Sequence, residues 1–254
     1  SSLPEPDAPT IDRLSPASTA KLTSCKMTSG CSPLNTCLPR LIACTISAMK
    51  NFSLAVLKVI LLVSVLWQPC TAHAAKNILV FGDSLSAGYG IAAEKNWVRL
   101  LQQELKHTHP GYEIVNASIS GETTLGGRQR IARALQQHRP AIVILELGAN
   151  DGLRGYRTAD IEANLGEIIK QAKRSRARVL LIGMKLPPNY GNPYITEFEN
   201  MYSRLAAKHR IGLLPFLLEG VAPEHFQADN LHPTAPGQPR IMQNVMQKLG
   251  PLLN

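Results

Sequence analysis

Cysteine is absent beyond position 70 of this 254-residue chain, and this absence limits the chemistry open to most of it. The cysteines that are present are Cys25, Cys31, Cys37, Cys44 and Cys70. A domain formed by the residues that follow can therefore contain no disulfide, no zinc ribbon and no cysteine nucleophile.

Aromatic residues are also scarce, at 5% of the chain, and no long run of lysine and arginine occurs. With 44% hydrophobic and 18% charged residues, the composition is that of an ordinary globular chain with room for one domain of good size. The formal charge of +9 would suit nucleic acid or an anionic surface, but the densest basic segment is only KRSRAR at 173–178. Cations favour the carboxyl ends of helices, so we interpret this segment as a solvent-facing helix end and expect no nucleic-acid partner.

Long hydrophobic runs are missing as well. The apolar stretch VILLVSVLW at 59–67 is too short to cross a bilayer as a helix. It follows Met49-Lys50 and Lys58 and precedes Ala72-His73-Ala74. This order of basic, apolar and small residues is typical of a signal peptide, here cleaved after Ala74.

Residues 1–48 are rich in serine, proline and threonine and show no apolar period. We therefore expect 1–48 to be an untranslated or disordered extension, 49–74 to be the signal peptide and 75–254 to be the folded domain. No stable membrane anchor should remain after export, because Cys70 follows Trp67-Gln68-Pro69 instead of the small residues that lipidation needs.

Strand and helix patterns alternate from residue 75 onward. Short apolar runs bounded by Gly, Pro or Asn predict buried strands at 77–81, 112–118, 141–148, 178–184 and, more weakly, 212–216. Helical periods lie between them, at about 95–107, 124–138, 159–174, 194–209 and 234–249, although the proline-rich PTAPGQPR could shift the start of the last one. The alternation predicts a three-layer α/β/α domain of flavodoxin type with a five-stranded parallel sheet in the order 2-1-3-4-5.

Polar clusters follow the predicted strands, at the sheet edge where such folds place their ligand sites. They are Gly82-Asp83-Ser84, Ser120-Gly121-Glu122, Gly148-Ala149-Asn150-Asp151 and, before the last helix, Asp229 with His232. Each cluster by itself would also suit an ordinary turn. Their conjunction in this order favours a common site.

A serine hydroxyl becomes a good nucleophile when a base removes its proton and a third group orients that base. We expect Ser84 to attack, His232 to act as the base and Asp229 to orient it. The backbone N–H groups of Ser84 and Gly121 and the side-chain amide of Asn150 are candidate oxyanion donors. His225 is an alternative base. His107 and His109 could bind a metal, but no third ligand is evident and this chemistry needs none.

The segments FGDSLSAGYG, NASISGETT, LELGANDGLRG and DNLHPTA resemble the four blocks of the GDSL or SGNH hydrolase superfamily, which is named for its Ser, Gly, Asn and His. The resemblance assigns these roles to Ser84, Gly121, Asn150 and His232, with Asp229 as the aspartate of the last block. The sequence does not match the G-x-S-x-G elbow of α/β-hydrolases, because Ser86 stands where that elbow requires glycine.

Within the superfamily, ELGANDGLRGY and LPPNYG resemble the periplasmic multifunctional thioesterases, arylesterases and lysophospholipases of Gram-negative bacteria. This implies a cofactor-free, periplasmic and monomeric enzyme. It would hydrolyse fatty acyl thioesters, aryl esters and lysophospholipids through an acyl-enzyme on Ser84. A carbohydrate O-deacetylase on the same scaffold and a non-enzymatic flavodoxin-like binding module are the alternatives.

Segments 152–158 and 185–194 follow the third and fourth strands, so we expect them to wall the acyl groove. The side chains that could either contact an acyl chain or simply pack are Leu153, Tyr156, Leu186, Pro187, Pro188 and Tyr190. Arg154 and Arg157 could meet an anionic head group or only water. The first strand–helix loop lacks a phosphate-cradling run of glycines and hydroxyls, which disfavours a flavin.

Overall fold

The computed structural model describes residues 75–253. The predicted extension, the signal peptide and its cleavage site lie outside these residues. None of the helices in the described part of the chain is both long enough and apolar enough to cross a membrane.

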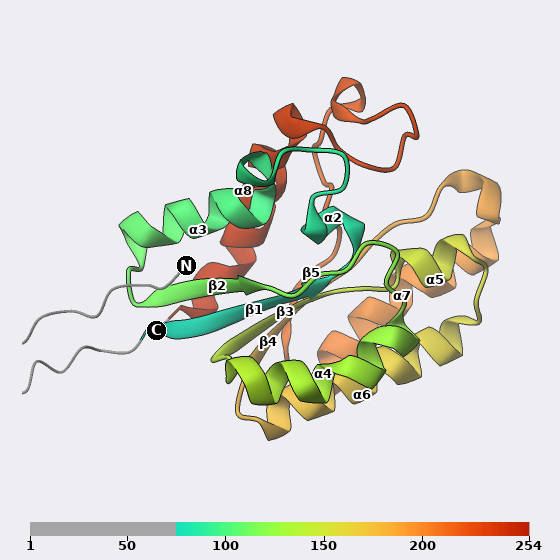
Figure 1. Cartoon of the computed structure of the whole chain (residues 1–254). Coiled ribbons are helices and arrows are strands. Elements are labelled where there is room, and N and C mark those ends of the chain that lie inside the picture. The colour runs from blue at the N-terminus through green and yellow to red at the C-terminus, as the bar shows by residue number, and fades with distance from the viewer. Residues whose placement is uncertain (1–74, 254) are drawn as a thin grey trace, which may run out of the picture. The chain divides into compact units, whose positions relative to one another are not determined.

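The centre of the domain is a parallel sheet of five strands (Figure 1). The strands are β1 (Lys76–Gly82), β2 (Tyr112–Asn116), β3 (Ile142–Glu146), β4 (Arg178–Ile182) and β5 (Gly212–Leu214). Their order is β2-β1-β3-β4-β5, which confirms the order predicted from sequence. Every residue of β3 is buried, because a parallel sheet is covered on both faces.

Two layers of helices cover the sheet. Figure 1 shows α3 (Trp97–Thr108) and α8 (Gln238–Leu249) on one face, and α4 (Thr124–His138), α6 (Thr158–Arg174) and α7 (Asn192–His209) on the other. The basic segment 173–178 comprises the end of α6 and the loop into β4, as expected, but its last residue, Arg178, is already the first residue of β4. The last helix begins at Gln238 and not at 234, because a 3₁₀ turn over Ala235–Gly237 precedes it and Pro239 occupies its first turn.

Two very short helices were not predicted. They are α2 (Ser84–Ala87) and α5 (Ala149–Leu153), and each begins within three residues of the end of a strand, at the carboxyl edge of the sheet. A single helical turn is too short to show a period of 3.6 residues, so the sequence pattern gave no sign of either.

Trp97 connects the core to this edge. Its side chain is fully buried, and its indole Nε1 donates to the carbonyl oxygen of Leu85 in α2 at 3.2 Å. The backbone N–H of Trp97 donates to Oε1 of Gln238, the first residue of α8, at 3.0 Å. The one-turn helix α2 is thus fixed to the larger helices α3 and α8.

Candidate active site

Ser84 is the first residue of α2, immediately after β1. The preceding residue, Asp83, caps the helix, because its Oδ1 accepts a hydrogen bond from the Leu85 N–H at 3.1 Å. Gly88 ends the helix in the left-handed region at φ 82°, where glycine is favoured. This local structure presents Ser84 at the carboxyl edge of the sheet.

Ser84, His232 and Asp229 form a continuous hydrogen-bonded chain. His232 Nε2 lies 2.8 Å from Ser84 Oγ, and His232 Nδ1 lies 2.7 Å from Asp229 Oδ2. Asp229 Oδ1 accepts the backbone N–H groups of Leu231 and His232. The second of these bonds is the main cause that lowers the pKa of Asp229 to about 2. An ionised Asp229 fixes the imidazole proton on Nδ1 and leaves Nε2 free to accept the serine proton.

The loops of Ser84 and His232 also contact each other directly. The Tyr89 ring lies against the His232 ring, with centroids 4.7 Å apart. Gln227 Nε2 donates to the Tyr89 carbonyl at 2.9 Å, and the Gln227 N–H donates to the His232 carbonyl at 2.8 Å. Sequence reasoning missed both residues; Tyr89 lies within the first motif, whereas nothing in the sequence pointed to Gln227.

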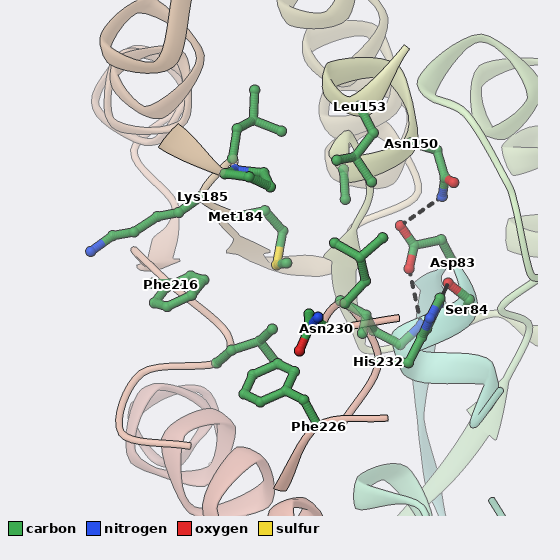
Figure 2. A pocket seen from close by; sticks show the side chains of 16 residues that line it. Asp83, Ser84, Asn150, Leu153, Met184, Lys185, Phe216, Phe226, Asn230 and His232 are labelled. Carbon is green, nitrogen blue, oxygen red and sulfur yellow. Dashed lines mark hydrogen bonds between the residues drawn. The ribbon is translucent and has the colours of Figure 1, made fainter. Parts of the chain in front are cut away.

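Asn150 lies in α5 and faces the turn that carries Ser84 (Figure 2). Its Nδ2 donates one hydrogen bond to Asp83 Oδ2 at 3.1 Å. An amide nitrogen carries two hydrogens, so the second remains available to a substrate oxygen.

Gly121 lies in the loop after β2 with φ 77°, a left-handed conformation that favours glycine. Apart from Gly121 and its two chain neighbours, no atom in the described part of the chain lies within 4 Å of where a Cβ would be. The glycine is therefore explained by its backbone conformation and not by close packing against the protein.

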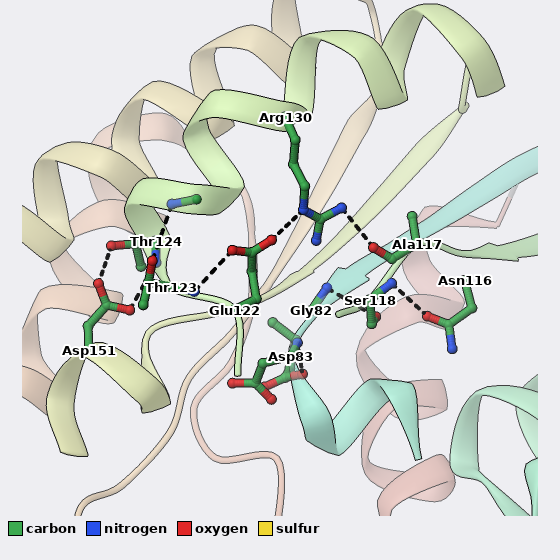
Figure 3. Close-up of polar contacts among 12 residues, drawn as sticks. Gly82, Asp83, Asn116, Ala117, Ser118, Glu122, Thr123, Thr124, Arg130 and Asp151 are labelled. Atoms are coloured by element: carbon green, nitrogen blue, oxygen red, sulfur yellow. Dashed lines mark hydrogen bonds and ion pairs between the residues drawn. The ribbon is translucent and has the colours of Figure 1, made fainter. Parts of the chain in front are cut away.

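The loop that carries Gly121 is held by a network of polar contacts (Figure 3). Arg130 of α4 forms an ion pair with Glu122, donates to the Ala117 carbonyl at 2.8 Å and lies over the Phe81 ring at 3.8 Å. At the start of the loop, Ser118 Oγ accepts the Gly82 N–H at 3.1 Å. The loop is thereby attached both to α4 and to the end of β1.

A second contact joins this region to the helix of Asn150. Asp151 accepts two hydrogen bonds from Thr124, one from its N–H at 2.9 Å and one from its hydroxyl at 2.6 Å. Both Thr124 and Asp151 are buried. The loops after β2 and β3 are consequently held in a fixed relation, as Figure 3 shows.

A cavity of about 340 Å³ opens beside Ser84. Its wall is mostly apolar and includes Leu153, Met184, Lys185, Leu186, Pro187, Phe216, Leu218, Phe226 and Leu231 together with Ser84, Asn150 and His232. Figure 2 shows the Lys185 side chain at the rim, with its ammonium group pointing away from Ser84. Gly121 does not line this cavity.

Of the residues expected to contact an acyl chain, the structure places Leu153, Leu186 and Pro187 in the cavity wall. Tyr156, Pro188 and Tyr190 are not part of it. Tyr156 is 48% exposed and borders a different surface hollow with Leu125 and Arg157. The Tyr190 hydroxyl donates to the Leu153 carbonyl at 2.8 Å, so this ring supports the wall from outside.

The alternative histidines lie elsewhere. His225 ends a 3₁₀ turn, Pro223–His225, and its carbonyl accepts two hydrogen bonds from Thr234. His107 and His109 are at the end of α3, where Nδ1 of His109 contacts the Thr108 hydroxyl. Within residues 75–253, no group of three or more His, Cys, Asp or Glu side chains is placed to hold a metal ion.

An α/β/α domain whose parallel sheet carries a hydrogen-bonded serine, histidine and aspartate at its carboxyl edge is typical of a serine hydrolase. Comparison with known families agrees, because residues 80–240 match the GDSL-like Lipase/Acylhydrolase family. The chain therefore belongs to this family of hydrolases, and the resemblance seen in its four sequence motifs is confirmed.

Individual relatives support the same assignment. The chain is 46% identical over 182 residues to the esterase TesA of Pseudomonas aeruginosa, a match that covers 71% of this chain and 90% of that protein. It is 40% identical over 185 residues to thioesterase 1/protease 1/lysophospholipase L1 of Escherichia coli K12, a match that covers 72% of this chain and 88% of that protein. The crystal structure of TesA superposes with a TM-score of 0.69 at 45% identity, covering 70% of this chain and all of that one. These proteins are named as hydrolases, which argues against a non-enzymatic binding module.

Proposed function

We propose that the protein hydrolyses acyl esters and thioesters through an acyl-enzyme formed on Ser84. The observation that supports this best is the chain from Ser84 through His232 to Asp229, with distances of 2.8 and 2.7 Å, beside an apolar cavity. The base is already within reach of the proton it must remove, and the cavity offers room for an acyl group.

The reaction follows from this geometry in two halves. His232 Nε2 takes the Ser84 proton while Oγ attacks the carbonyl carbon, and the protonated imidazole then gives that proton to the departing alkoxide or thiolate. Water attacks the resulting acyl-enzyme with His232 again as base, which releases the acid and restores Ser84. Throughout, Asp229 stays ionised and stabilises the imidazolium.

The developing oxyanion needs donors on the same side of the carbonyl as Ser84. The Ser84 N–H is at the first position of α2 and so has no partner within the helix. We propose that this group, the Gly121 N–H and the free Asn150 amide hydrogen bind the oxyanion. The polar contacts around Arg130 and Asp151 would keep these donors in place.

The substrates we propose are fatty acyl thioesters, aryl esters and lysophospholipids, with the acyl chain in the cavity. Burying a methylene group contributes about 0.8 kcal/mol, or roughly a fourfold gain in kcat/KM, if the group is held in the transition state. We therefore expect kcat/KM for p-nitrophenyl esters to rise from acetyl to longer chains until the cavity is filled. Acyl-coenzyme A thioesters of the same chain lengths should follow the same trend.

A matched pair of variants tests whether the acyl chain of the substrate lies in the cavity. Phe216→Ala removes a ring from the cavity wall and should flatten the rise, whereas Tyr156→Ala removes an aromatic side chain outside the cavity and should leave it unchanged. A preference for acetyl, with rates falling steadily as the chain grows, would support a carbohydrate O-deacetylase instead.

We also propose that the enzyme acts as a monomer in the periplasm without a stable membrane anchor, as the signal-peptide pattern of residues 49–74 suggests. The intact mass of the protein purified from its native cells should correspond to a chain beginning at Ala75. A mass that includes residues 1–48 would contradict the proposed processing, and a mass increased by acyl groups would contradict the absence of an anchor.

A further inference from the structure

Glu146 is a buried carboxyl group that has no role in the proposed reaction of Ser84, His232 and Asp229. It is the last residue of β3 and its side chain is 0% exposed. Its Oε2 accepts hydrogen bonds from the Ser86 hydroxyl at 2.7 Å and from the Asp83 N–H at 3.3 Å. Its Oε1 has no hydrogen-bond partner in the described part of the chain. Since buried glutamate is costly, such a group calls for a physical reason.

Its position is directly beneath the turn that presents Ser84. Gly82 pairs with Glu146 across β1 and β3, and a Cβ on Gly82 would lie 2.6 Å from Glu146 Oε2. The carboxyl group therefore lies against the backbone at Gly82. It also accepts hydrogen bonds from Asp83, just before Ser84, and from Ser86, two residues after it. No other side chain in the described region forms hydrogen bonds with both the Asp83 N–H and the Ser86 hydroxyl.

Asp83 carries this support further. It is 1% exposed; its Oδ1 caps α2 through Leu85, and its Oδ2 accepts the Asn150 amide. A shift in the Asp83 backbone would therefore move both the serine turn and the amide proposed to bind the oxyanion. Glu146 is the side chain that holds the Asp83 N–H.

The charges in this region are consistent with a neutral Glu146. Burial, and then the nearby Asp83, raise the pKa of Glu146 well above its usual range. Burial also raises the pKa of Asp83 to about 6, against the lowering effects of the Leu85 N–H and His232, while Asp151 raises it further. Tyr202, whose hydroxyl donates to the Leu147 carbonyl, also faces this pair; burial is the main cause that raises the pKa of Tyr202 well above its usual range, and Glu146 and Asp83 raise it further. A neutral Glu146 avoids placing a second negative charge beside the Asp83 carboxylate.

We propose that Glu146 is a positioning residue for ester hydrolysis, a buried carboxyl group that fixes the turn around Ser84 and, through Asp83, the direction of the Asn150 amide. This inference rests on the proposed function of Ser84. It goes beyond that function by assigning a role to a residue that does not line the cavity and forms no hydrogen bond with Ser84, His232 or Asp229.

The test compares two substitutions at one position. Glu146→Gln keeps an acceptor oxygen at Oε2 and has the charge of the neutral acid, so kcat and its pH profile should stay close to wild type. Glu146→Leu fills the space but leaves the Asp83 N–H and the Ser86 hydroxyl unpaired. We expect it to lower kcat about 10²-fold with little change in KM, as small displacements of reacting groups do.

A control separates positioning from general destabilisation. Asn77→Leu removes the hydrogen bond from Asn77 Nδ2 to the His138 carbonyl, at the opposite end of β1. It should lower Tm while kcat stays unchanged. If Glu146→Leu does no more than this, the proposal is overturned. If Glu146→Gln loses as much activity as Glu146→Leu, or the acidic limb of its pH profile moves to lower pH, a negative charge at Glu146 matters more than its hydrogen bonds, and the proposal is wrong.

Two further measurements keep the result interpretable. Where Glu146→Leu does not fold, Ser86→Ala removes one of the two donors and leaves Glu146 in place; it should lower kcat at constant KM, and wild-type kcat would overturn the proposal. In Glu146→Leu an organophosphonate should still label Ser84 to completion, but more slowly, whereas Glu146→Gln should be labelled at the wild-type rate. If even the wild-type enzyme is not labelled at Ser84, the proposed function has failed, independently of Glu146.

Discussion

Replacing Ser84 by alanine is expected to lower kcat for ester hydrolysis by about 10⁶-fold, the size of the effect when a serine hydrolase loses its nucleophile. KM should change little, because the apolar cavity proposed to bind the acyl chain is untouched. The measurement is release of p-nitrophenol at pH 8. In parallel, an organophosphonate should add one covalent label to the wild-type enzyme and none to Ser84→Ala.

The neighbouring residues provide a graded comparison. His232→Ala should cost as much as Ser84→Ala, and the double variant should cost no more than either, since the two groups act as one unit. Asp229→Ala should cost less, about 10⁴-fold, because an orienting group does not itself exchange the proton. Activity above a hundredth of wild type in Ser84→Ala would place the nucleophile elsewhere. A folded Asp229→Ala variant that loses as much as Ser84→Ala would give Asp229 a different role.

Much of this arrangement could be predicted from the sequence, because alternating strands and helices restrict the topology strongly. Once the four clear apolar runs are taken as parallel strands, their carboxyl ends must meet at one edge. That rule brings the turns of Ser84, Gly121 and Asn150 to this edge. His232 follows none of these four runs, and only the structure shows that its Nε2 lies 2.8 Å from Ser84 Oγ, 148 positions away in sequence.

The remaining details depend on side-chain directions that no periodicity reveals. Tyr156, Tyr190 and Leu153 are equally plausible wall residues in sequence, yet only Leu153 lines the cavity. The difference comes from the one-turn helix α5, which turns Leu153 toward Ser84 and leaves Tyr156 beyond its end. Helices this short leave no pattern in the sequence, so their effect on direction is seen only in the structure.

Glu146 is a case in which a signal was present. It stands within the run AIVILELG, whose other side chains are apolar, and glutamate is rarely found fully buried unless it is paired. What the sequence could not show is the partner. The contacts with Asp83 and Ser86 depend on the parallel register that sets Gly82 opposite Glu146.

Replacing Asn150 by alanine should lower kcat by about 10²- to 10³-fold, the usual cost of losing one oxyanion donor. In the resting structure the amide uses one hydrogen on Asp83 Oδ2, and only the other can reach a substrate. That bond helps to hold down the pKa of Asp83, which burial raises to about 6. Without Asn150 this pKa must rise, so kcat is to be measured at pH 8 to 9, well above the pKa of about 6 in the wild-type protein.

A double variant separates the two roles of Asn150. If Asn150 serves only to pair with the buried Asp83 charge, Asp83→Asn should restore activity to Asn150→Ala, because no charge then needs a partner. If Asn150 binds the oxyanion, the double variant should stay at least as slow as Asn150→Ala. The affinity for a tetrahedral phosphonate should fall in parallel with kcat, while KM for the planar ester stays nearly constant, because only the transition state carries the negative oxygen. An unchanged kcat in Asn150→Ala would remove this amide from the site and leave the oxyanion to the backbone N–H groups of Ser84 and Gly121.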